Sequence, residues 1–392
     1  MSTKFIPLSV PNLKGNELKY VTHAVETEWV SSGGQYIIDF ETQFADFLDA
    51  PKAVAVQSGT AALHLALMEA GVQPGEEVIA PTLTFIAAVN PIRYCGAEPV
   101  FMDCDDSLCM DPVKLKRFLT KECTFDNGIL TNNKTGKRIR ALVVVHVFGN
   151  IADMEAIIPI AEALDLAVIE DATEALGSKY VTGKYEGVHA GLYGDYGAFS
   201  FNGNKIMTTG GGGMLVAKNN EHLNHMQHIS TQAKENPVNF IHDEVGYNYR
   251  LTNLQAALGL GQIEQLNDFI QTKHDNYAYY LELFKDNPNV ELVPFREGTE
   301  SNKWFYALYI KNRADIQAIM DQLQASNIQT RPIWGLIHQQ KPYQKNESFE
   351  ISKAIDYSQH IINIPCSTNL SKEDVAYVAA CINKLTLEEE SL

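Results

Sequence analysis

Lys205 is the residue of this sequence whose type and setting point most directly to chemistry. It lies in a polar loop within AFSFNGNKIMTTGGGGM (198–214), after an apolar run that ends at Phe201. A lysine held in a turn can form a Schiff base if its surroundings keep the amine deprotonated. A solvated surface lysine is the alternative. The four glycines that follow do not have the spacing of a nucleotide-binding loop, and they would let the backbone pass close to a cofactor or partner.

Two acidic residues stand at the end of another apolar run. Glu170 and Asp171 occur together in LAVIEDATEALG (166–177), which predicts a buried strand that delivers both to its carboxyl end. In open α/β sheets, ligands bind beyond the carboxyl ends of the strands. A carboxylate there can hold a cation, a ribose hydroxyl or a protonated ring nitrogen. The alternative is that Asp171 caps a helix over Ala172–Leu176.

A third segment has the features of an anion site. Ser58, Gly59 and Thr60 form a turn between an apolar run and a helix-like stretch that begins at Ala61. The free N–H groups of a helix start attract anions, and Gly59 would allow close approach, so the turn predicts a phosphate cradle. The alternative is that Ser58 or Thr60 only caps the helix.

Short apolar runs separated by helix-like stretches must position these groups. Seven strands are predicted at Ala53–Gln57, Val78–Ala80, Pro99–Met102, Ala141–Val145, Ala167–Glu170, Tyr196–Phe201 and Met214–Ala217. Helical patterns, such as Ala61–Ala70 and Met154–Leu164, lie between several of them. This alternation predicts an α/β fold with a seven-stranded, mostly parallel sheet that is covered on both faces.

The pattern changes in the last third of the chain. Lys121–Arg140 predicts an inserted hairpin or loop, and Lys234–Glu244 predicts a further loop. The later elements are predicted as a helical stretch at Leu251–Phe284, strands at Glu291–Pro294 and Trp304–Ile310, and a helix at Ala314–Ser326. We therefore predict a large domain over residues 1–260 and a smaller C-terminal α/β domain over residues 261–392.

Composition excludes several classes of function. The net charge is −17 at pH 7, which disfavours binding to nucleic acid or anionic membranes but not to a small anionic ligand. The six cysteines include no Cys-x-x-Cys pair, so reduced and mostly buried thiols are expected. The start of the chain lacks the apolar core of a signal peptide, and the most apolar stretch, Ala141–Phe148, is shorter than a bilayer span. We expect a cytoplasmic protein.

Three histidines recur at a regular spacing. His222, His225 and His228 lie three residues apart, and neighbours on a helix face could bind a metal ion. No carboxylate lies between them, and a three-residue period drifts around a helix. A solvated or packed face is therefore favoured, and no metal site is predicted.

The first three segments converge on one cofactor. Pyridoxal phosphate needs a cradle for its phosphate, an acid that keeps its ring nitrogen protonated, and a lysine for a Schiff base. The turn at residues 58–60, Asp171 and Lys205 would supply these three groups.

The sequence resembles the DegT/DnrJ/EryC1/StrS family of sugar aminotransferases over nearly the whole chain. The motifs that carry the resemblance are IPLSVPNLKGNE, WVSSGG, SGTAAL, APTLTF, EDATEALG, SFNGNK, GYNYRLTNLQAALG and TRPIWGLIH. The resemblance implies the fold-type I, aspartate aminotransferase-like architecture and pyridoxal 5'-phosphate, which becomes pyridoxamine phosphate in the half-reaction. Within the family, TLTFIAAVNPIRYCGAEPVFMDCD, EDATEALGS and NGNKIMTTGGGGM look most like the LegC/PglE-type branch.

The resemblance implies a role for each matching residue. Lys205 matches the Schiff-base lysine, and Asp171 matches the partner of the pyridinium nitrogen. The remaining cofactor positions are Ser58, Gly59 and Thr60 in the phosphate cradle, Ser200 as a further phosphate ligand, Phe85 stacked on the ring, and Glu174 near O3′. Many relatives carry Gln or His at the position of Glu174. We interpret this departure as a trait of the branch, and the carboxylate would need a proton or a balancing charge.

The resemblance also implies how subunits assemble, through Asn248. It matches a family residue that reaches the phosphate of the neighbouring subunit, which implies a homodimer with shared active sites. From position alone, Asn248 and Arg250 stand just before a helix, where polar side chains could reach an anion. The apolar face of that helix, which includes Leu251 and Leu254, favours ordinary core packing as the alternative.

The resemblance also implies a reaction. The LegC/PglE-type branch aminates C4 of UDP-4-keto-6-deoxy-N-acetylhexosamines in bacillosamine or legionaminic acid biosynthesis, and we expect L-glutamate as the donor. The implied substrate-binding positions are Ser32, Gly33 and Gly34 in WVSSGGQ, and Arg331 and His338 in RPIWGLIH. For the last two, an Arg-Pro turn and a surface histidine are the alternatives.

Other functions on the same fold differ in their key residues. A C3 aminotransferase acting on a dTDP- or UDP-3-ketosugar is one alternative. A non-catalytic regulator that binds pyridoxal phosphate is another, although no DNA-binding helix or basic extension is visible. Lys205 argues against a sugar dehydratase, since those relatives carry histidine at this position.

Overall fold

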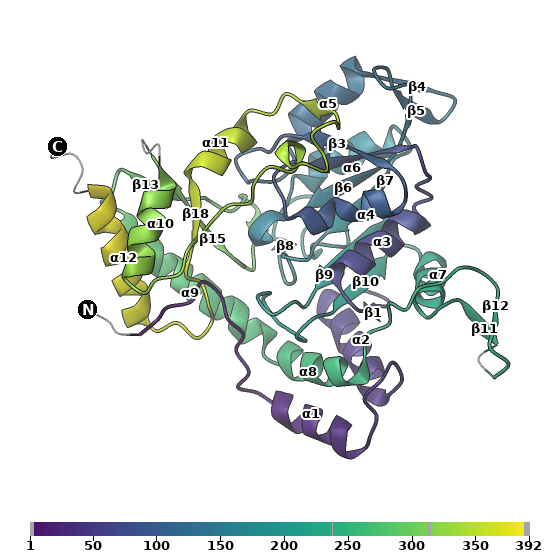
Figure 1. Cartoon of the computed structure of the whole chain (residues 1–392), viewed down its shortest axis with the longest axis horizontal. Helices are drawn as coiled ribbons and strands as arrows, with labels where there is room; N and C mark the ends of the chain where they lie inside the picture. Colours follow the sequence, from purple (N-terminus) through teal and green to yellow (C-terminus); the bar gives the residue numbers. More distant parts are fainter. Residues whose placement is uncertain (1–3, 237, 312–314, 388–392) are drawn as a thin grey trace.

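A large mixed sheet positions most of the predicted site residues. The computed structural model describes residues 4–236, 238–311 and 315–387. Eight strands of the sheet lie side by side in the order β1 (Val54–Val56), β10 (Gly213–Ala217), β9 (Tyr196–Ser200), β7 (Ala167–Asp171), β6 (Arg138–Val145), β2 (Glu77–Pro81), β3 (Glu98–Met102) and β17 (Ser348–Phe349). A hairpin of β4 (Cys123–Asp126) and β5 (Ile129–Asn132) extends the sheet from β6 (Figure 1). This hairpin confirms the insertion predicted at Lys121–Arg140.

The seven predicted strands are all present in this sheet, but the sheet has ten strands rather than seven, because the β4–β5 hairpin and β17 also join it. From β9 through β7, β6, β2 and β3 to β17, each strand is parallel to the next. Strand β10 is antiparallel to both β9 and β1. The link from β9 to β10 is a polar loop without a helix, and such a link favours an antiparallel return rather than a crossover. The expectation of an α/β fold with a mostly parallel sheet is confirmed.

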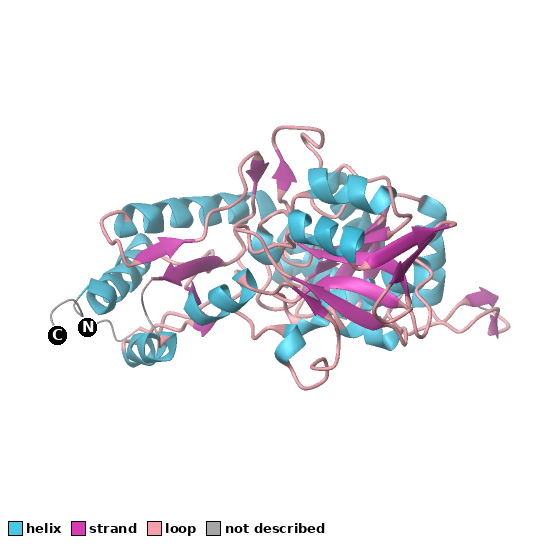
Figure 2. Ribbon diagram, turned by 90° about the horizontal axis from the view of Figure 1, so that it is seen from above, coloured by secondary structure: helices cyan, strands magenta, loops and turns pink. Residues whose placement is uncertain are grey.

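Helices lie on both sides of the sheet, as the cyan elements above and below the strands show in Figure 2. The helices of the first 263 residues are α1 (Glu17–Glu26), α2 (Gln35–Leu48), α3 (Gly59–Glu69), α4 (Asn90–Tyr94), α5 (Pro112–Lys121), α6 (Met154–Glu162), α7 (Asn220–Ser230) and α8 (Asn253–Ile263), with short 3₁₀ turns η1 (Ile86–Ala88) and η2 (Val147–Gly149). Helix α3 is buried almost throughout because it packs between the sheet and α7. Its apolar sequence on every side fits this position.

A second, smaller sheet follows along the chain. It has the order β13 (Val290–Leu292), β15 (Tyr306–Ile310), β18 (Ile361–Ile364) and β16 (Arg331–Pro332), and all its pairs are antiparallel. Its helices are α9 (Leu266–Phe284), α10 (Ile316–Ala325), α11 (Lys353–His360) and α12 (Lys372–Leu387), with the turn η3 (Ile337–Gln339). Strands β8 (Lys179–Tyr180) and β14 (Thr299–Glu300) form a separate pair. The domain division at residue 260 stays a prediction, since α8 spans that point and β17 returns to the large sheet.

Two predicted segments differ from the structure. The stretch Leu251–Phe284 is two helices, α8 and α9, which are separated at Glu264–Gln265. The predicted loop at Lys234–Glu244 contains a short hairpin of β11 (Lys234–Asn236) and β12 (Ile241–His242) that projects from the body in Figure 1. The predicted helix at Ala314–Ser326 is present as α10, but its first residue, Ala314, lies outside the described residues.

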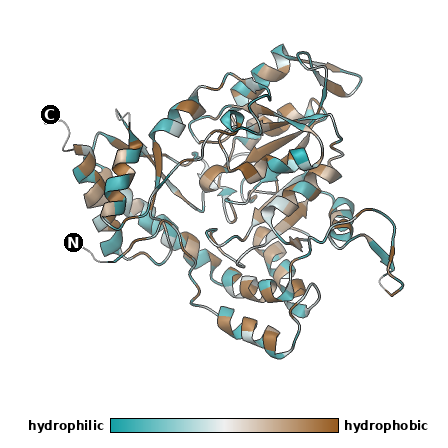
Figure 3. Ribbon diagram, in the orientation of Figure 1, coloured by the Kyte–Doolittle hydropathy of each residue, from teal (hydrophilic) through white to brown (hydrophobic). Residues whose placement is uncertain are grey.

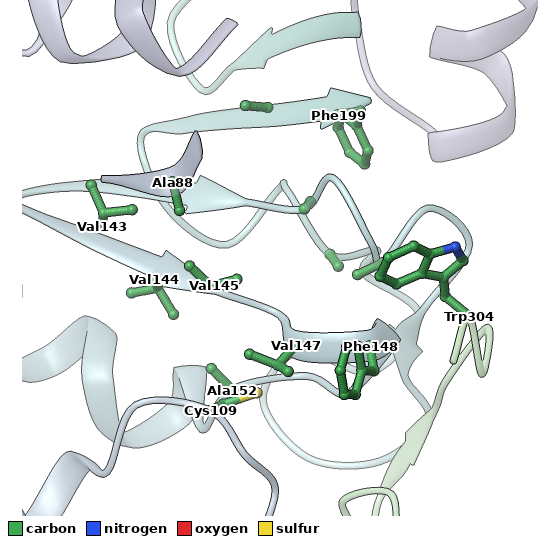
Figure 4. Close-up of a cluster of buried hydrophobic side chains, with 14 of the residues drawn as sticks. Ala88, Cys109, Val143, Val144, Val145, Val147, Phe148, Ala152, Phe199 and Trp304 are labelled. Carbon is green, nitrogen blue, oxygen red and sulfur yellow. The ribbon is translucent and has the colours of Figure 1, made fainter. Parts of the chain in front are cut away.

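The apolar core reaches the carboxyl end of the large sheet. Residues 141–145 of β6 are at most 2% exposed, which is expected for a strand covered on both faces. Figure 3 shows the corresponding brown strands enclosed by more polar helices. In Figure 4, Phe148 and Trp304 lie at one end of the buried cluster, beyond Val145.

Cys104, Cys109 and Cys366 are buried and the other three cysteines are partly buried. Within the described residues, no helix is both long and apolar enough to cross a membrane.

Candidate active site

A cavity of about 260 Å³ lies at the carboxyl ends of β7 and β9. Eight of the predicted cofactor residues line it: Ser58, Gly59, Thr60, Phe85, Asp171, Glu174, Ser200 and Lys205. They come from four separate stretches of the chain, which the strands of the large sheet bring to one edge of the sheet. Larger cavities elsewhere among the described residues, of about 320, 440, 620 and 700 Å³, contain none of these eight residues.

The start of α3 forms one wall of this cavity. Ser58 is the N-cap, and its hydroxyl accepts a hydrogen bond from the Ala61 N–H at 3.0 Å. The predicted capping alternative is therefore correct for Ser58, but it does not exclude anion binding, because the first N–H groups of a helix have no intrahelical partner. A Cβ atom on Gly59 would lie 2.8 Å from Thr173 Cγ2 and 2.9 Å from Ser200 Cβ. Gly59 thus lets the helix start approach the end of β9 closely.

Asp171 is the last residue of β7, and it lines the cavity. Its side chain is buried, and Oδ1 accepts a hydrogen bond from the Thr173 N–H at 3.1 Å. Residues 172–176 form turns rather than a helix, so the prediction that Asp171 caps a helix there is wrong. Burial raises the pKa of Asp171, while Thr173 and Lys205 oppose this shift. A cationic group beside the carboxylate would stabilise its charged form.

Glu170, the neighbouring acid, points the other way and is part of the core. Its carboxylate accepts hydrogen bonds from the N–H groups of Gly191, Tyr193 and Gly194 and lies 2.8 Å from His146 Nε2. Successive side chains of a strand point to opposite faces, so only one of the two acids can face the cavity. Glu170 therefore supports the sheet, and Asp171 faces the cavity.

Lys205 and the buried Glu174 form a partly buried ion pair in the cavity. The Lys205 Nζ lies 3.3 Å from Glu174 Oε1 and 4.1 Å from the centre of a Trp304 ring. The second oxygen of Glu174 accepts the Phe148 N–H at 2.9 Å. Burial raises the pKa of Glu174 to about 7, although the charge of Lys205 acts to lower it. Glu174 can therefore be either protonated or balanced by Lys205, which meets the requirement that the sequence raised for a carboxylate at this position.

These residues fit pyridoxal phosphate. Free N–H groups at the start of α3 suit its phosphate, the buried carboxylate of Asp171 suits a protonated ring nitrogen, and Lys205 offers a primary amine. Phe85, which is 54% exposed at the cavity wall, offers an aromatic surface. Gly59 allows the helix start to lie against Thr173 and Ser200, which places its N–H groups beside the other residues of the cavity.

Six predicted site residues lie outside this cavity. Asn248 is exposed and pairs with Thr231 in an isolated bridge. Gly34 lines a different cavity, and Ser32 and Gly33 are exposed beside it. The two residues of the RPIWGLIH segment are also elsewhere: Arg331 is exposed on β16, and His338 Nδ1 lies 2.6 Å from Thr82 Oγ1. Arg250, which could have reached an anion, instead pairs with Glu41 and the Ala55 carbonyl.

Several residues that line the cavity were not predicted. Trp304 and Phe305 stack with ring centres 4.0 Å apart, and the Trp304 indole donates a hydrogen bond to the Asn204 carbonyl. Trp334, from the predicted RPIWGLIH segment, also lines the cavity. Thr173 also lines the cavity, and its position between Asp171 and Glu174 in the sequence could have indicated that it would. For Trp304, far along the chain, no local signal was available.

Comparison with known proteins gives a consistent result. The model of the DegT/DnrJ/EryC1/StrS aminotransferase family matches residues 11–383. The chain is 36% identical over 384 residues to GDP-perosamine synthase of Escherichia coli O157:H7, covering 97% of this chain and 98% of that protein. It is 31% identical over 373 residues to dTDP-3-amino-3,6-dideoxy-alpha-D-galactopyranose transaminase of Aneurinibacillus thermoaerophilus, covering 93% of both. A solved DegT DnrJ EryC1 StrS aminotransferase from Brucella abortus superposes with a TM-score of 0.85 at 25% identity, covering 95% of both chains.

Proposed function

Because the chain belongs to the DegT/DnrJ/EryC1/StrS aminotransferase family, whose members depend on pyridoxal phosphate, we propose a specific transfer of an amino group. The donor is L-glutamate, and the acceptor is C4 of a UDP-4-keto-6-deoxy-N-acetylhexosamine. The product is UDP-4-amino-4,6-dideoxy-N-acetylglucosamine. The observation that carries the aminotransferase function is the cavity that unites the start of α3 with Asp171, Glu174 and Lys205.

Each of these residues has a defined task in the proposed reaction. When bound, pyridoxal phosphate supplies an aldehyde that takes up the donor's amino group and a ring that withdraws electrons from the reacting carbon. The N–H groups of Gly59 and Thr60, with the hydroxyl of Ser200, bind the phosphate. Asp171 holds a proton on the ring nitrogen. Lys205 Nζ delivers a proton to C4 of the sugar, and Glu174 balances the charge of that amine.

Two considerations support a 4-amino product. The TLTFIAAVNPIRYCGAEPVFMDCD, EDATEALGS and NGNKIMTTGGGGM motifs are similar to those of the branch that aminates C4 of UDP-linked N-acetyl sugars. GDP-perosamine synthase is a 4-amino enzyme. Its similarity also makes a GDP-linked 4-ketosugar the second candidate acceptor. A C3 acceptor is a further alternative, which the 31% identity to the dTDP-3-amino sugar transaminase favours.

A substrate panel distinguishes these acceptors. Purified enzyme is supplied with L-glutamate and, in separate reactions, a UDP-4-ketosugar with an N-acetyl group, a GDP-4-ketosugar and a dTDP-3-ketosugar. We expect the UDP-linked compound to react with a kcat/KM about tenfold or more above the others, because a pocket that hydrogen-bonds a substrate group discriminates strongly against analogues without it. Mass spectrometry and NMR identify the product.

Other results of the panel would change the assignment. If the GDP-4-ketosugar reacted faster, the nucleotide of the assigned substrate would be GDP rather than UDP. A 3-amino product would move the assigned site of amination from C4 to C3. Absence of product with every acceptor, in protein that has bound the cofactor, would favour the non-catalytic regulator.

We further propose that the active unit is a homodimer in which Asn248 reaches the phosphate bound by the partner subunit. Asn248 does not line the cavity of its own chain, although a phosphate role is implied for it. It follows the projecting β11–β12 hairpin, around which Val238, Phe240 and Val245 are each at least 75% exposed. Large exposed apolar groups in one region are a common feature of protein interfaces.

Hybrid dimers test this arrangement. We expect Lys205→Ala and Asn248→Asp to be inactive alone, the second because a carboxylate repels the phosphate. After subunit exchange, half of the dimers are hybrids, and each has one site with both residues intact. The mixture should therefore regain about a quarter of the wild-type activity. As a control, mixing Lys205→Ala with a Lys205→Ala, Asn248→Asp double variant should regain none. Proven exchange without recovery, or a fully active monomer in sedimentation, would refute the shared site.

A further inference from the structure

The two groups that contact the Lys205 amine come from distant parts of the chain. Glu174 belongs to the turn that follows β7, and Trp304 lies just before β15. Asn302 is fully buried between these two parts and is hydrogen-bonded to both. The proposed reaction gives no task to this side chain.

The side-chain amide of Asn302 has three partners. Its Nδ2 donates to the backbone carbonyls of Glu174 and Leu176, each at 2.9 Å. Its Oδ1 accepts the backbone N–H of Trp304 at 2.9 Å. Because an amide donates only from its nitrogen and accepts only at its oxygen, these partners fix which way the side chain faces. Aspartate would have the same shape but would lack both amide donors.

The neighbouring backbone holds Asn302 and leaves room for it. The Asn302 N–H donates to Ser178 Oγ at 2.9 Å, and the Ser178 hydroxyl donates to the Gly149 carbonyl at 2.8 Å. Gly149 has a φ of +87°, and a Cβ atom there would lie 1.9 Å from Asn302 Oδ1. The residue before it, Phe148, donates its N–H to Glu174 Oε2. The same stretch of chain therefore accommodates Asn302 and holds the carboxylate that pairs with Lys205.

Trp304 is held at each of its polar atoms. Its backbone N–H donates to Asn302, and its indole N–H donates to the Asn204 carbonyl at 2.7 Å. Its own carbonyl accepts a hydrogen bond from Nζ of the buried Lys273 at 2.8 Å. The ring centre lies 4.1 Å from the Lys205 Nζ, where an aromatic face attracts an ammonium group. The held ring therefore helps to fix the position of the amine.

We propose that Asn302 is a positioning residue, which holds Glu174 and Trp304 and, through them, the amine of Lys205 in the geometry for proton transfer. This inference rests on the proposed role of Lys205. When pyridoxamine phosphate is bound, no covalent bond joins Lys205 to the cofactor, so noncovalent contacts must hold the amine. Its ion pair with Glu174 and its contact with the Trp304 ring would do so.

Trace acetylation of Lys205 tests this inference without a measurement of turnover. The full-length protein, loaded with pyridoxamine phosphate, reacts briefly with acetic anhydride. Mass spectrometry then compares the acetylation of Lys205 with that of the exposed Lys218. In Asn302→Asp, which loses both amide donors, we expect Lys205 to react about tenfold faster, because loss of these hydrogen bonds releases the amine from its contacts.

Steady-state kinetics supply a second measurement on the same variant. Asn302→Asp should lower kcat on the order of 100-fold and leave KM for L-glutamate within about threefold of the wild type, since a displaced amine affects the chemical step rather than binding. If this variant fails to fold, Ser178→Ala takes its place. It removes the hydroxyl that accepts the Asn302 N–H, and we expect smaller changes in the same directions.

Asn287 provides the matched control. It is buried, its Nδ2 donates to Asn383 and Thr386, and its Oδ1 accepts the N–H of Asn289. It therefore has the same two donors and one acceptor in use, but it does not line the cavity. Asn287→Asp should lower thermal stability and leave both the acetylation of Lys205 and kcat at the wild-type values.

Three results would overturn the proposal. They are wild-type acetylation of Lys205 in folded Asn302→Asp and Ser178→Ala variants, an equal rise in Asn287→Asp, and a raised KM with unchanged kcat in Asn302→Asp. The acetylation measurement needs no acceptor sugar. It therefore distinguishes a failure of this inference from a failure of the proposed function.

Discussion

Replacement of Lys205 by alanine is expected to lower kcat by roughly 10⁴-fold or more, because it removes a nucleophilic amine and a proton carrier at once. Lys205 is the only lysine among the described residues that line the cavity, so no neighbouring amine can take over its tasks. Steady-state assays with L-glutamate and the ketosugar measure the loss. Single-turnover assays should show a comparable loss of rate in each of the two half-reactions.

The fold should survive this change. Lys205→Ala leaves Glu174 without its ion-pair partner, but burial already raises the pKa of that carboxyl to about 7, so protonation can remove its charge. Lys218→Ala, at an exposed position just beyond β10, is the matched control and should keep wild-type activity. Turnover of a correctly folded Lys205→Ala variant within tenfold of the wild type would disprove the proposed role.

Asp171→Asn is expected to lower kcat by roughly 10³-fold with little change in KM, since one electrostatic partner of a developing charge commonly contributes this much. The amide keeps the shape of the side chain, and its oxygen can still accept the Thr173 N–H. It carries no charge to hold a proton on the ring nitrogen. Both half-reactions should therefore slow, as single-turnover measurements with glutamate and with the ketosugar can establish.

Asp165→Asn provides the comparison for this variant. Asp165 is exposed just before the start of β7, at the end of the strand opposite Asp171, and its replacement should leave kcat unchanged. If Asp171→Asn raised only KM while kcat stayed at the wild-type value, the carboxylate would serve ground-state binding rather than the chemical step.

Much of the large sheet could be predicted because its strands carry local signals. Short apolar runs between helical patterns indicated all seven strands, and the mostly parallel arrangement followed from the helices between them. Strand β17 has only two residues and pairs with β3 from far along the chain, so no local pattern marks it. The break between α8 and α9 at Glu264–Gln265 was missed because neither Gly nor Pro marks it.

The centre of the candidate site was predictable for a related reason. Asp171, Lys205 and the turn at residues 58–60 each follow a strand, and the carboxyl ends of parallel strands meet at one edge of a sheet. Trp304 and Trp334 come from the later part of the chain, and only the packing of that part against the large sheet brings them to the cavity. The contacts of His225 with Glu69 and Glu244 likewise depend on the fold rather than on sequence spacing.

Reduction with borohydride, followed by peptide mapping, tests most directly the claim that this cavity holds the cofactor on Lys205. The resting enzyme should be yellow, and borohydride should fix the cofactor irreversibly to the protein. We expect mass spectrometry to find the label on the peptide that contains Lys205, with one label per chain. A label on a different lysine, or a cofactor that washes out after reduction, would contradict the proposed active site.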